Sequence, residues 1–122
     1  MIIAFTGSKH VKDEEQLRLS LSLLKAREDI TLVHVGDCAG VDEIVRRVCD
    51  KNSIPVKVFY TDWWSYGTAA TPIRTSKMLE SADLFICVFG VGKDNEVSRV
   101  AMQQAHARGI DTLSVWVKVD NV

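Results

Sequence analysis

Short hydrophobic runs alternate with segments of helical periodicity along this chain of 122 residues. The runs predict β-strands at Ile2–Thr6, Ile30–Val35, Val56–Tyr60, Leu84–Phe89 and Thr112–Val117. The first, second and fourth runs are almost continuously hydrophobic, which is typical of parallel strands covered on both faces. The third and fifth carry more polar residues, which indicates that they are edge strands.

The segments between these runs predict helices. Leu17, Leu21 and Leu24 follow the acidic stretch Asp13–Glu15 at the spacing of one buried helix face. The other helices are expected at Glu43–Lys51, from a Thr71 cap and Pro72 to about Ala82, and from the end of the Gly90–Asn95 loop to Arg108, before Gly109. The longest connection is Thr61–Thr71.

Strands separated by helices form right-handed crossovers between parallel strands. The pattern therefore predicts an α/β fold: a Rossmann-like three-layer sandwich with a mostly parallel five-stranded sheet. We expect residues 1–122 to form a single domain, because their number suits one core.

Composition excludes several classes of protein. With 15 Lys and Arg against 16 Asp and Glu, the chain lacks the basic excess of proteins that coat nucleic acid. No hydrophobic run is long enough to cross a membrane, and Met1–Phe5 is interpreted as a strand rather than a signal peptide. The odd, scattered set Cys38, Cys49 and Cys87 indicates a reducing, cytoplasmic location. Cysteines and histidines show no paired ligand spacing, so neither a metal nor a cofactor is expected.

The segment Gly36–Asp42 is the strongest candidate for a binding site. It joins a predicted strand to a predicted helix. Backbone N–H groups at a helix start lack partners and carry partial positive charge, which suits a phosphate group. In a parallel sheet, ligands bind beyond the carboxyl ends of the strands, where Gly7–Lys9, Asp62–Arg74 and Gly90–Glu96 also lie.

These segments together resemble the SLOG superfamily, which contains the DprA/Smf and LOG proteins, and above all its small stand-alone bacterial and phage members. The matching motifs are Thr6-Gly7-Ser8-Lys9, Gly36-Asp37-Cys38-Ala39-Gly40-Val41-Asp42, Pro72-Ile73-Arg74 with Met78, and Phe89-Gly90-Val91-Gly92. The resemblance implies a Rossmann-like domain that binds a nucleotide or a nucleotide-derived ligand. Enzymes of the superfamily cleave the N-glycosidic bond of a nucleoside monophosphate, and other members sense nucleotide signals or bind single-stranded DNA.

This chain departs from those enzymes after its fourth strand. Gly90–Glu96 lacks the Pro, the Gly-Gly pair and the Gly-Thr of their catalytic loop. The predicted ligand-binding residues are Gly7, Ser8, Lys9, Gly36, Asp37, Cys38, Ala39, Gly40, Asp42, Arg74, Gly90 and Gly92. If the protein is an enzyme, Arg74 and Glu96 are its candidate catalytic residues.

Most of these residues also have a structural interpretation. Arg74 is expected in the first turn of its helix, either binding phosphate or paired on the surface with Asp62 or a neighbouring acid. Asp42 caps its helix or accepts a hydrogen bond from a ribose hydroxyl; both roles can hold at once. Asp37 would repel a phosphate, and so turns away or faces a ribose or a base. Glu96 suits a helix start electrostatically, whether or not it is catalytic.

The remaining candidate residues also have both a functional and a structural interpretation. Ser8 and Lys9 either contact a phosphate or form an ordinary solvated loop. Cys38 is a packed thiol or a nucleophile activated at a helix start. The aromatic residues Trp63, Trp64 and Tyr66 either stack a base or cover a subunit contact.

The leading hypothesis is a binder of a nucleotide-derived ligand, such as a signalling nucleotide or an ADP-ribose derivative. The alternatives are a nucleoside 5′-monophosphate phosphoribohydrolase and a single-stranded DNA-binding protein; the charge balance makes nucleic acid an unlikely partner. The hydrophobic segment Leu113–Val117 predicts a homodimer or larger assembly, because an uncovered hydrophobic edge strand promotes association.

Overall fold

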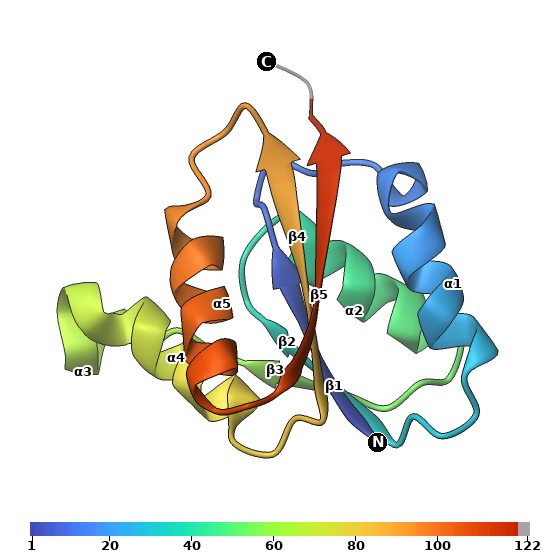
Figure 1. Ribbon diagram of the computed structural model, residues 1–122, viewed down its shortest axis with the longest axis horizontal. Coiled ribbons are helices and arrows are strands. Elements are labelled where there is room, and N and C mark those ends of the chain that lie inside the picture. Colours follow the sequence, from blue (N-terminus) through green and yellow to red (C-terminus); the bar gives the residue numbers. More distant parts are fainter. Residues whose placement is uncertain (120–122) are drawn as a thin grey trace.

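The computed structural model describes residues 1–119 as a three-layer α/β sandwich (Figure 1). Its strands are β1 (Ile2–Gly7), β2 (Leu32–Gly36), β3 (Val56–Phe59), β4 (Leu84–Val91) and β5 (Asp111–Lys118). They form one five-stranded sheet in the order β3-β2-β1-β4-β5, and every pairing is parallel. The predicted Rossmann-like fold is confirmed, and β3 and β5 are its edges.

Helices cover both faces of the sheet (Figure 1). On one face, Leu21 and Leu24 of α1 (Arg18–Ala26) and Ile44 and Val48 of α2 (Val41–Lys51) pack into a single hydrophobic cluster with β1 and β2. On the other, α4 (Ala70–Leu79) and α5 (Glu96–Ala107) pack on Phe85, Cys87 and Phe89 of β4. Both clusters are closed to water, which accounts for the continuous hydrophobic runs of β1 and β4.

The helix starts differ from those predicted. The acidic stretch leads into a short 3-10 turn, η1 (Glu14–Leu17), capped by Asp13, before α1 begins. Gly40, not Asp42, is the N-cap of α2, so Asp42 lies inside its first turn. The predicted Thr71 cap is also wrong: α4 begins at Ala70, directly after the 3-10 turn η2 (Gly67–Ala69), and Pro72 lies within its first turn. A proline is tolerated there because the first N–H groups of a helix have no helical partner.

Two further boundaries depend on tertiary contacts. The Thr61–Thr71 connection contains a short helix, α3 (Trp63–Tyr66), capped by Asp62 and without a buried residue. Gly90, predicted to lie in a loop, belongs to β4, because β5 pairs with that strand as far as Val91. The end of α5 is as predicted, with Gly109 in a left-handed conformation at φ 69°.

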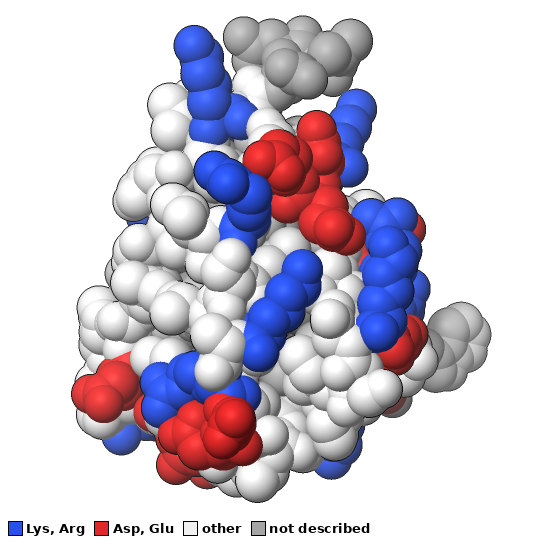
Figure 2. Space-filling view, turned by 90° about the vertical axis from the view of Figure 1, so that its right-hand side faces the viewer, with Lys and Arg blue, Asp and Glu red and all other residues white. Residues whose placement is uncertain are grey.

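Helix hydrophobicity and surface charge both bear on the expectations from composition. Within residues 1–119, no helix has both the length and the hydrophobicity to cross a membrane. On the face shown in Figure 2, lysine and arginine side chains are interspersed with acidic ones, and no continuous basic stripe crosses it. This mixture agrees with the near-zero net charge of the sequence.

Candidate functional site

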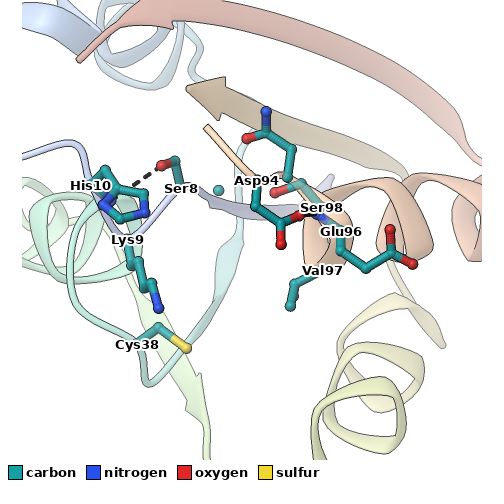
Figure 3. Close-up of a pocket in the computed structure, with 10 residues that line it drawn as sticks. Ser8, Lys9, His10, Cys38, Asp94, Glu96, Val97 and Ser98 are labelled. Carbon is teal, nitrogen blue, oxygen red and sulfur yellow. Dashed lines mark hydrogen bonds between the residues drawn. The ribbon is translucent and has the colours of Figure 1, made fainter. Parts of the chain in front are cut away.

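A cavity of about 280 Å³ opens at the carboxyl ends of β1 and β4 (Figure 3). The chain leaves β1 towards β2 and leaves β4 towards β5, in opposite directions across the sheet. Such a switch point is where open α/β sheets bind ligands. We call this space the switch-point cavity; its walls are Gly7, Ser8, Lys9, His10, Cys38, Asp94, Asn95, Glu96, Val97 and Ser98.

The sheet edge holds the β1 side of the cavity in place. Ser8 donates its backbone N–H to Val88 O at 2.9 Å, which extends the pairing of β1 with β4 by one residue. The Ser8 side chain is 8% exposed and accepts a hydrogen bond from the backbone N–H of His10. This turn therefore presents Ser8, Lys9 and His10 from a fixed backbone.

Asn95 shapes the opposite wall. Its buried side chain accepts from Gly90 N at 3.0 Å and donates to Gly90 O at 2.9 Å and Lys93 O at 3.0 Å. Asn95 is the N-cap residue of α5, yet its side chain forms no capping hydrogen bond, because it closes the preceding loop instead. Only the Glu96 N–H is capped, by Asp94 at 2.9 Å. The N–H groups of Val97 and Ser98 thus remain available to a ligand.

Ser98 adds a hydroxyl group to this helix start. Its residue is 5% exposed, and it lines the cavity on the side opposite Ser8 (Figure 3). Its carbonyl accepts a hydrogen bond from Cys87 Sγ, but its hydroxyl forms none within residues 1–119. The hydroxyl can therefore form hydrogen bonds with a molecule in the cavity.

At the start of α2, where the sequence predicts a phosphate cradle, one of the first three N–H groups is paired, that of Val41, while those of Asp42 and Glu43 form no hydrogen bond within residues 1–119. The Val41 N–H donates to Ser8 O at 3.2 Å, and the Cys38 N–H donates to Asp42 Oδ2 at 3.2 Å. Gly40 packs directly on the β1 loop: a Cβ atom at this position would lie 2.4 Å from Ser8 O. The glycine motif thus joins two loops.

Arg74 is the centre of a buried ionic cluster beneath this turn. Its side chain is 2% exposed, and Nη1 lies 3.2 Å from Asp37 Oδ1 and 3.3 Å from Cys38 Sγ. Arg74 lies in the second turn of α4, not the first, and it pairs with Asp37 rather than with Asp62 on the surface. Its Nε has no partner within residues 1–119.

The pKa values of the two acids in this cluster, Asp37 and Asp42, are shifted in opposite directions. Burial raises the pKa of Asp42, even though Thr6 donates to it at 2.6 Å and Arg74 is nearby. Burial also acts to raise the pKa of Asp37, but hydrogen bonds from the Thr61 backbone and hydroxyl and from Arg74 outweigh it and leave the pKa below its ordinary value. Asp37 therefore faces the loop after β3, and its hydrogen bonds to Thr61 connect that loop to the turn before α2.

The structure brings together five of the predicted site residues: Gly7, Ser8, Lys9, Cys38 and Glu96. The other predicted residues line neither this cavity nor the neighbouring one described below: Gly36, Asp37, Ala39, Gly40, Asp42, Arg74, Gly90 and Gly92. Gly90 lies directly behind Ser8, since a Cβ atom there would be 3.1 Å from Ser8 Oγ. Glu96 pairs with Arg99, so the two candidate catalytic residues are not in one cluster.

Sequence analysis missed five residues of the cavity: His10, Asp94, Asn95, Val97 and Ser98. The signal for α5 was present, because the helix starts just after a strand and a glycine-containing loop. The argument about unpaired N–H groups applies to this helix as it does to α2. The two starts differ in what they face: Glu96, Val97 and Ser98 of α5 line the cavity, whereas no residue of α2 does.

A second cavity of about 240 Å³ lies between α4 and α5. Its walls are Thr68, Thr71, Pro72, Thr75, Glu96, Val97 and Val100. Glu96 and Val97 line both spaces, so the second cavity adjoins the first. We call it the α4–α5 cavity.

An all-parallel sheet of this order, with a cavity at its switch point, defines a Rossmann-like α/β protein. The model of the YAcAr family, described as the YspA, cpYpsA-related SLOG family, matches residues 1–66. This match covers more than half of the chain, and the protein belongs to that family, which confirms the SLOG resemblance seen in the motifs. No curated protein and no solved structure matches this chain.

Proposed function

We propose that this protein binds a nucleotide-derived ligand whose phosphate lies in the switch-point cavity, between the β1 turn and the start of α5. The observation that carries the proposal is the Ser98 hydroxyl, which belongs to a buried residue, forms no hydrogen bond within residues 1–119 and lines the cavity beside open helix N–H groups. Hydroxyl and backbone N–H donors at a helix start are a common phosphate site. Membership of a SLOG family supports the same class of ligand.

Charges around the cavity favour a phosphate attached to a sugar over free phosphate. Lys9 supplies a cation, while Asp94 and Glu96 supply two carboxylates. Asp94 is occupied by the Glu96 N–H, and Glu96 by Arg99, which reduces their repulsion of an anion. Carboxylates accept hydrogen bonds from ribose hydroxyls, so Glu96 is placed to hold a ribose at the rim.

A thermal-shift screen tests this proposal. The ligands are nucleoside mono-, di- and triphosphates, ADP-ribose, NAD and cyclic nucleotides, each recovered afterwards for product analysis. A ligand that binds only the folded state raises the melting temperature by mass action. We expect at least one of them to do so, and the shift to shrink in Ser98→Ala.

Ser20→Ala is the matched control, because Ser20 is also a buried helical serine at 4% exposure but lines neither cavity. It should melt like the parent and keep the full ligand shift. The proposal fails if no ligand raises the melting temperature, or if Ser98→Ala retains the shift of the parent.

A second candidate function is hydrolysis of the N-glycosidic bond of a nucleoside 5′-monophosphate. The observation that favours it is the position of Glu96 in the wall shared by the two cavities, where the bond between ribose and base would lie. A carboxylate there can position water or stabilise the positive charge that develops on the sugar. Release of free base and ribose 5-phosphate, lost in Glu96→Gln, would establish this activity; a ligand recovered intact would leave the protein a binder.

A further inference from the structure

The α4–α5 cavity is lined by a second hydroxyl without a partner within residues 1–119, on the buried residue Thr75. Thr75 is 2% exposed and lies in α4. A threonine inside a helix commonly bonds to a carbonyl of its own preceding turn. The Thr75 hydroxyl forms no hydrogen bond within residues 1–119, and the residue lines the cavity. This hydroxyl is therefore available to a molecule inside the cavity.

The other walls of this cavity suit a flat, uncharged ring with polar edges. Pro72, Val97 and Val100 provide hydrophobic surface, and Thr68 and Thr71 provide further hydroxyl groups. Glu96 is the one ionised side chain among the wall residues, and it lies where the two cavities meet. Hydroxyl groups both donate and accept, which matches the mixed donors and acceptors on the edge of a nucleobase.

The sizes of the two cavities indicate one ligand that spans both. Pockets that bind drug-sized small molecules usually have a volume of about 300–1,000 Å³. At about 280 and 240 Å³, each cavity falls below this range, whereas together they lie within it. The two cavities adjoin at Glu96 and Val97, with the start of α5 on one side and Thr75 on the other.

We infer that the α4–α5 cavity is the subsite for the base, or another neutral heteroaromatic ring, of the ligand, and that Thr75 determines which ring is preferred. The inference rests on the proposed function, since the phosphate anchors the ligand in the switch-point cavity. The ligand then lies across the two cavities with its phosphate at Ser98, its ribose at Glu96 and its ring at Thr75.

Calorimetric titrations with ribose 5-phosphate and with AMP, GMP, CMP and UMP test the inference. Ribose 5-phosphate reports on the switch-point cavity alone, and each nucleotide adds one base. The variants are Thr75→Val, which keeps the shape and removes the hydroxyl, and Thr75→Ser, which restores it. Ser98→Ala is included to report on the phosphate.

We expect the preferred nucleotide to bind more tightly than ribose 5-phosphate, and Thr75→Val to weaken that nucleotide about fivefold while leaving ribose 5-phosphate unchanged. Thr75→Ser should recover most of the loss. Ser98→Ala should weaken both kinds of ligand. These results together would support the ring subsite.

Two outcomes would overturn the inference and leave the proposed function intact. In one, Thr75→Val binds every nucleotide as the parent does while Ser98→Ala still weakens them. In the other, Thr75→Val weakens ribose 5-phosphate as much as it weakens the nucleotides, which would make Thr75 a purely structural residue. Absence of binding by the parent to all five compounds would instead contradict the proposed function as well.

Discussion

At the scale of single residues, Arg74 has the clearest consequence. Its guanidinium is enclosed by Asp37, Asp42 and Cys38, and a Cβ atom on Gly36 would lie 2.9 Å from its Nη1. Burial opposes its charge, but the hydrogen bond to Cys38 and the nearby acids outweigh that effect and raise the pKa of Arg74. Removing one member of a buried ionic cluster leaves the others without compensation.

Arg74→Ala should therefore lower the free energy of unfolding by about 3–5 kcal/mol, because Asp37 and Asp42 would lose their counter-charge. Chemical denaturation of both proteins measures this difference. Arg46→Ala is the control: Arg46 is exposed on α2, and its loss should change stability by less than about 0.5 kcal/mol. Equal stability of Arg74→Ala and the parent would show that the cluster is unimportant to folding.

The three cysteines provide a second test at this scale. Cys38 is exposed beside the switch-point cavity, whereas Cys49 and Cys87 are buried. Burial raises the pKa of Cys49 to about 11 and that of Cys87 to about 12. At pH 8 we expect a thiol reagent to modify one cysteine per folded chain, since only a thiolate reacts.

In denaturant the same reagent should modify all three cysteines. Cys38→Ser should abolish the fast reaction of the folded protein. Rapid modification of two or three thiols without denaturant would mean that the core opens more readily than its packing indicates.

At the scale of elements, the glycine at the start of α2 determines how two loops meet. Gly40 has φ 80° and ψ −126°, and a Cβ atom there would lie 2.4 Å from Ser8 O and 2.6 Å from Lys9 Cα. Gly67 has a similar backbone conformation, with φ 54° and ψ −129°, but no atom lies within 4 Å of its Cβ position. The two positions thus share backbone strain and differ in the available space.

Gly67→Ala should cost about 1–2 kcal/mol from backbone strain alone. Gly40→Ala should cost at least about 2 kcal/mol more, because the α2 start and the β1 turn must move apart. Thermal and chemical denaturation of both variants measure the difference. Similar losses in the two variants would contradict the tight packing of Gly40 on the β1 turn.

At the scale of the whole molecule, the sheet has an uncovered edge. Within residues 1–119, β5 pairs with no strand other than β4, so its outer side can pair with another strand; near its end, Lys118 O accepts a hydrogen bond from the Gln16 side chain. Trp116 is 60% exposed although it stacks on Phe89, and Leu113 is 37% exposed. An edge of this length with exposed hydrophobic side chains favours association between chains.

We propose that the protein forms a homodimer through β5. Light scattering should then give twice the chain mass of 13.6 kDa, and Trp116→Lys should shift it towards a single chain. Trp64→Lys is the control, since Trp64 is 99% exposed on α3, away from this strand, and its loss should not change the mass. A single-chain mass for the parent protein would contradict the proposal.

Much of the fold was predictable because local patterns carry it. Continuous hydrophobic runs such as Leu84–Phe89 require burial on both faces, and the leucines of α1 require one partner surface. These periodicities indicated a parallel sheet between two helical layers and identified β3 and β5 as edges. That the Gly7–Lys9 turn and Glu96 line a cavity was also predictable, because they follow strands at the end of the sheet where such folds bind ligands.

Tertiary structure alone decided which polar groups are free. The sequence motif Gly36–Asp42 has the pattern of a phosphate loop, but Ser8 accepts the Val41 N–H, and Thr61 and Arg74 bind Asp37, all from distant segments. Conversely, Asn95 closes the β4 loop and leaves the start of α5 open to a ligand, with Ser98 and Thr75 unpartnered beside it within the described residues. Hydrophobic periodicity is a local property, so the sequence by itself determined the layers of the fold. Hydrogen-bond satisfaction depends on contacts between distant residues, so only the folded chain determined the site.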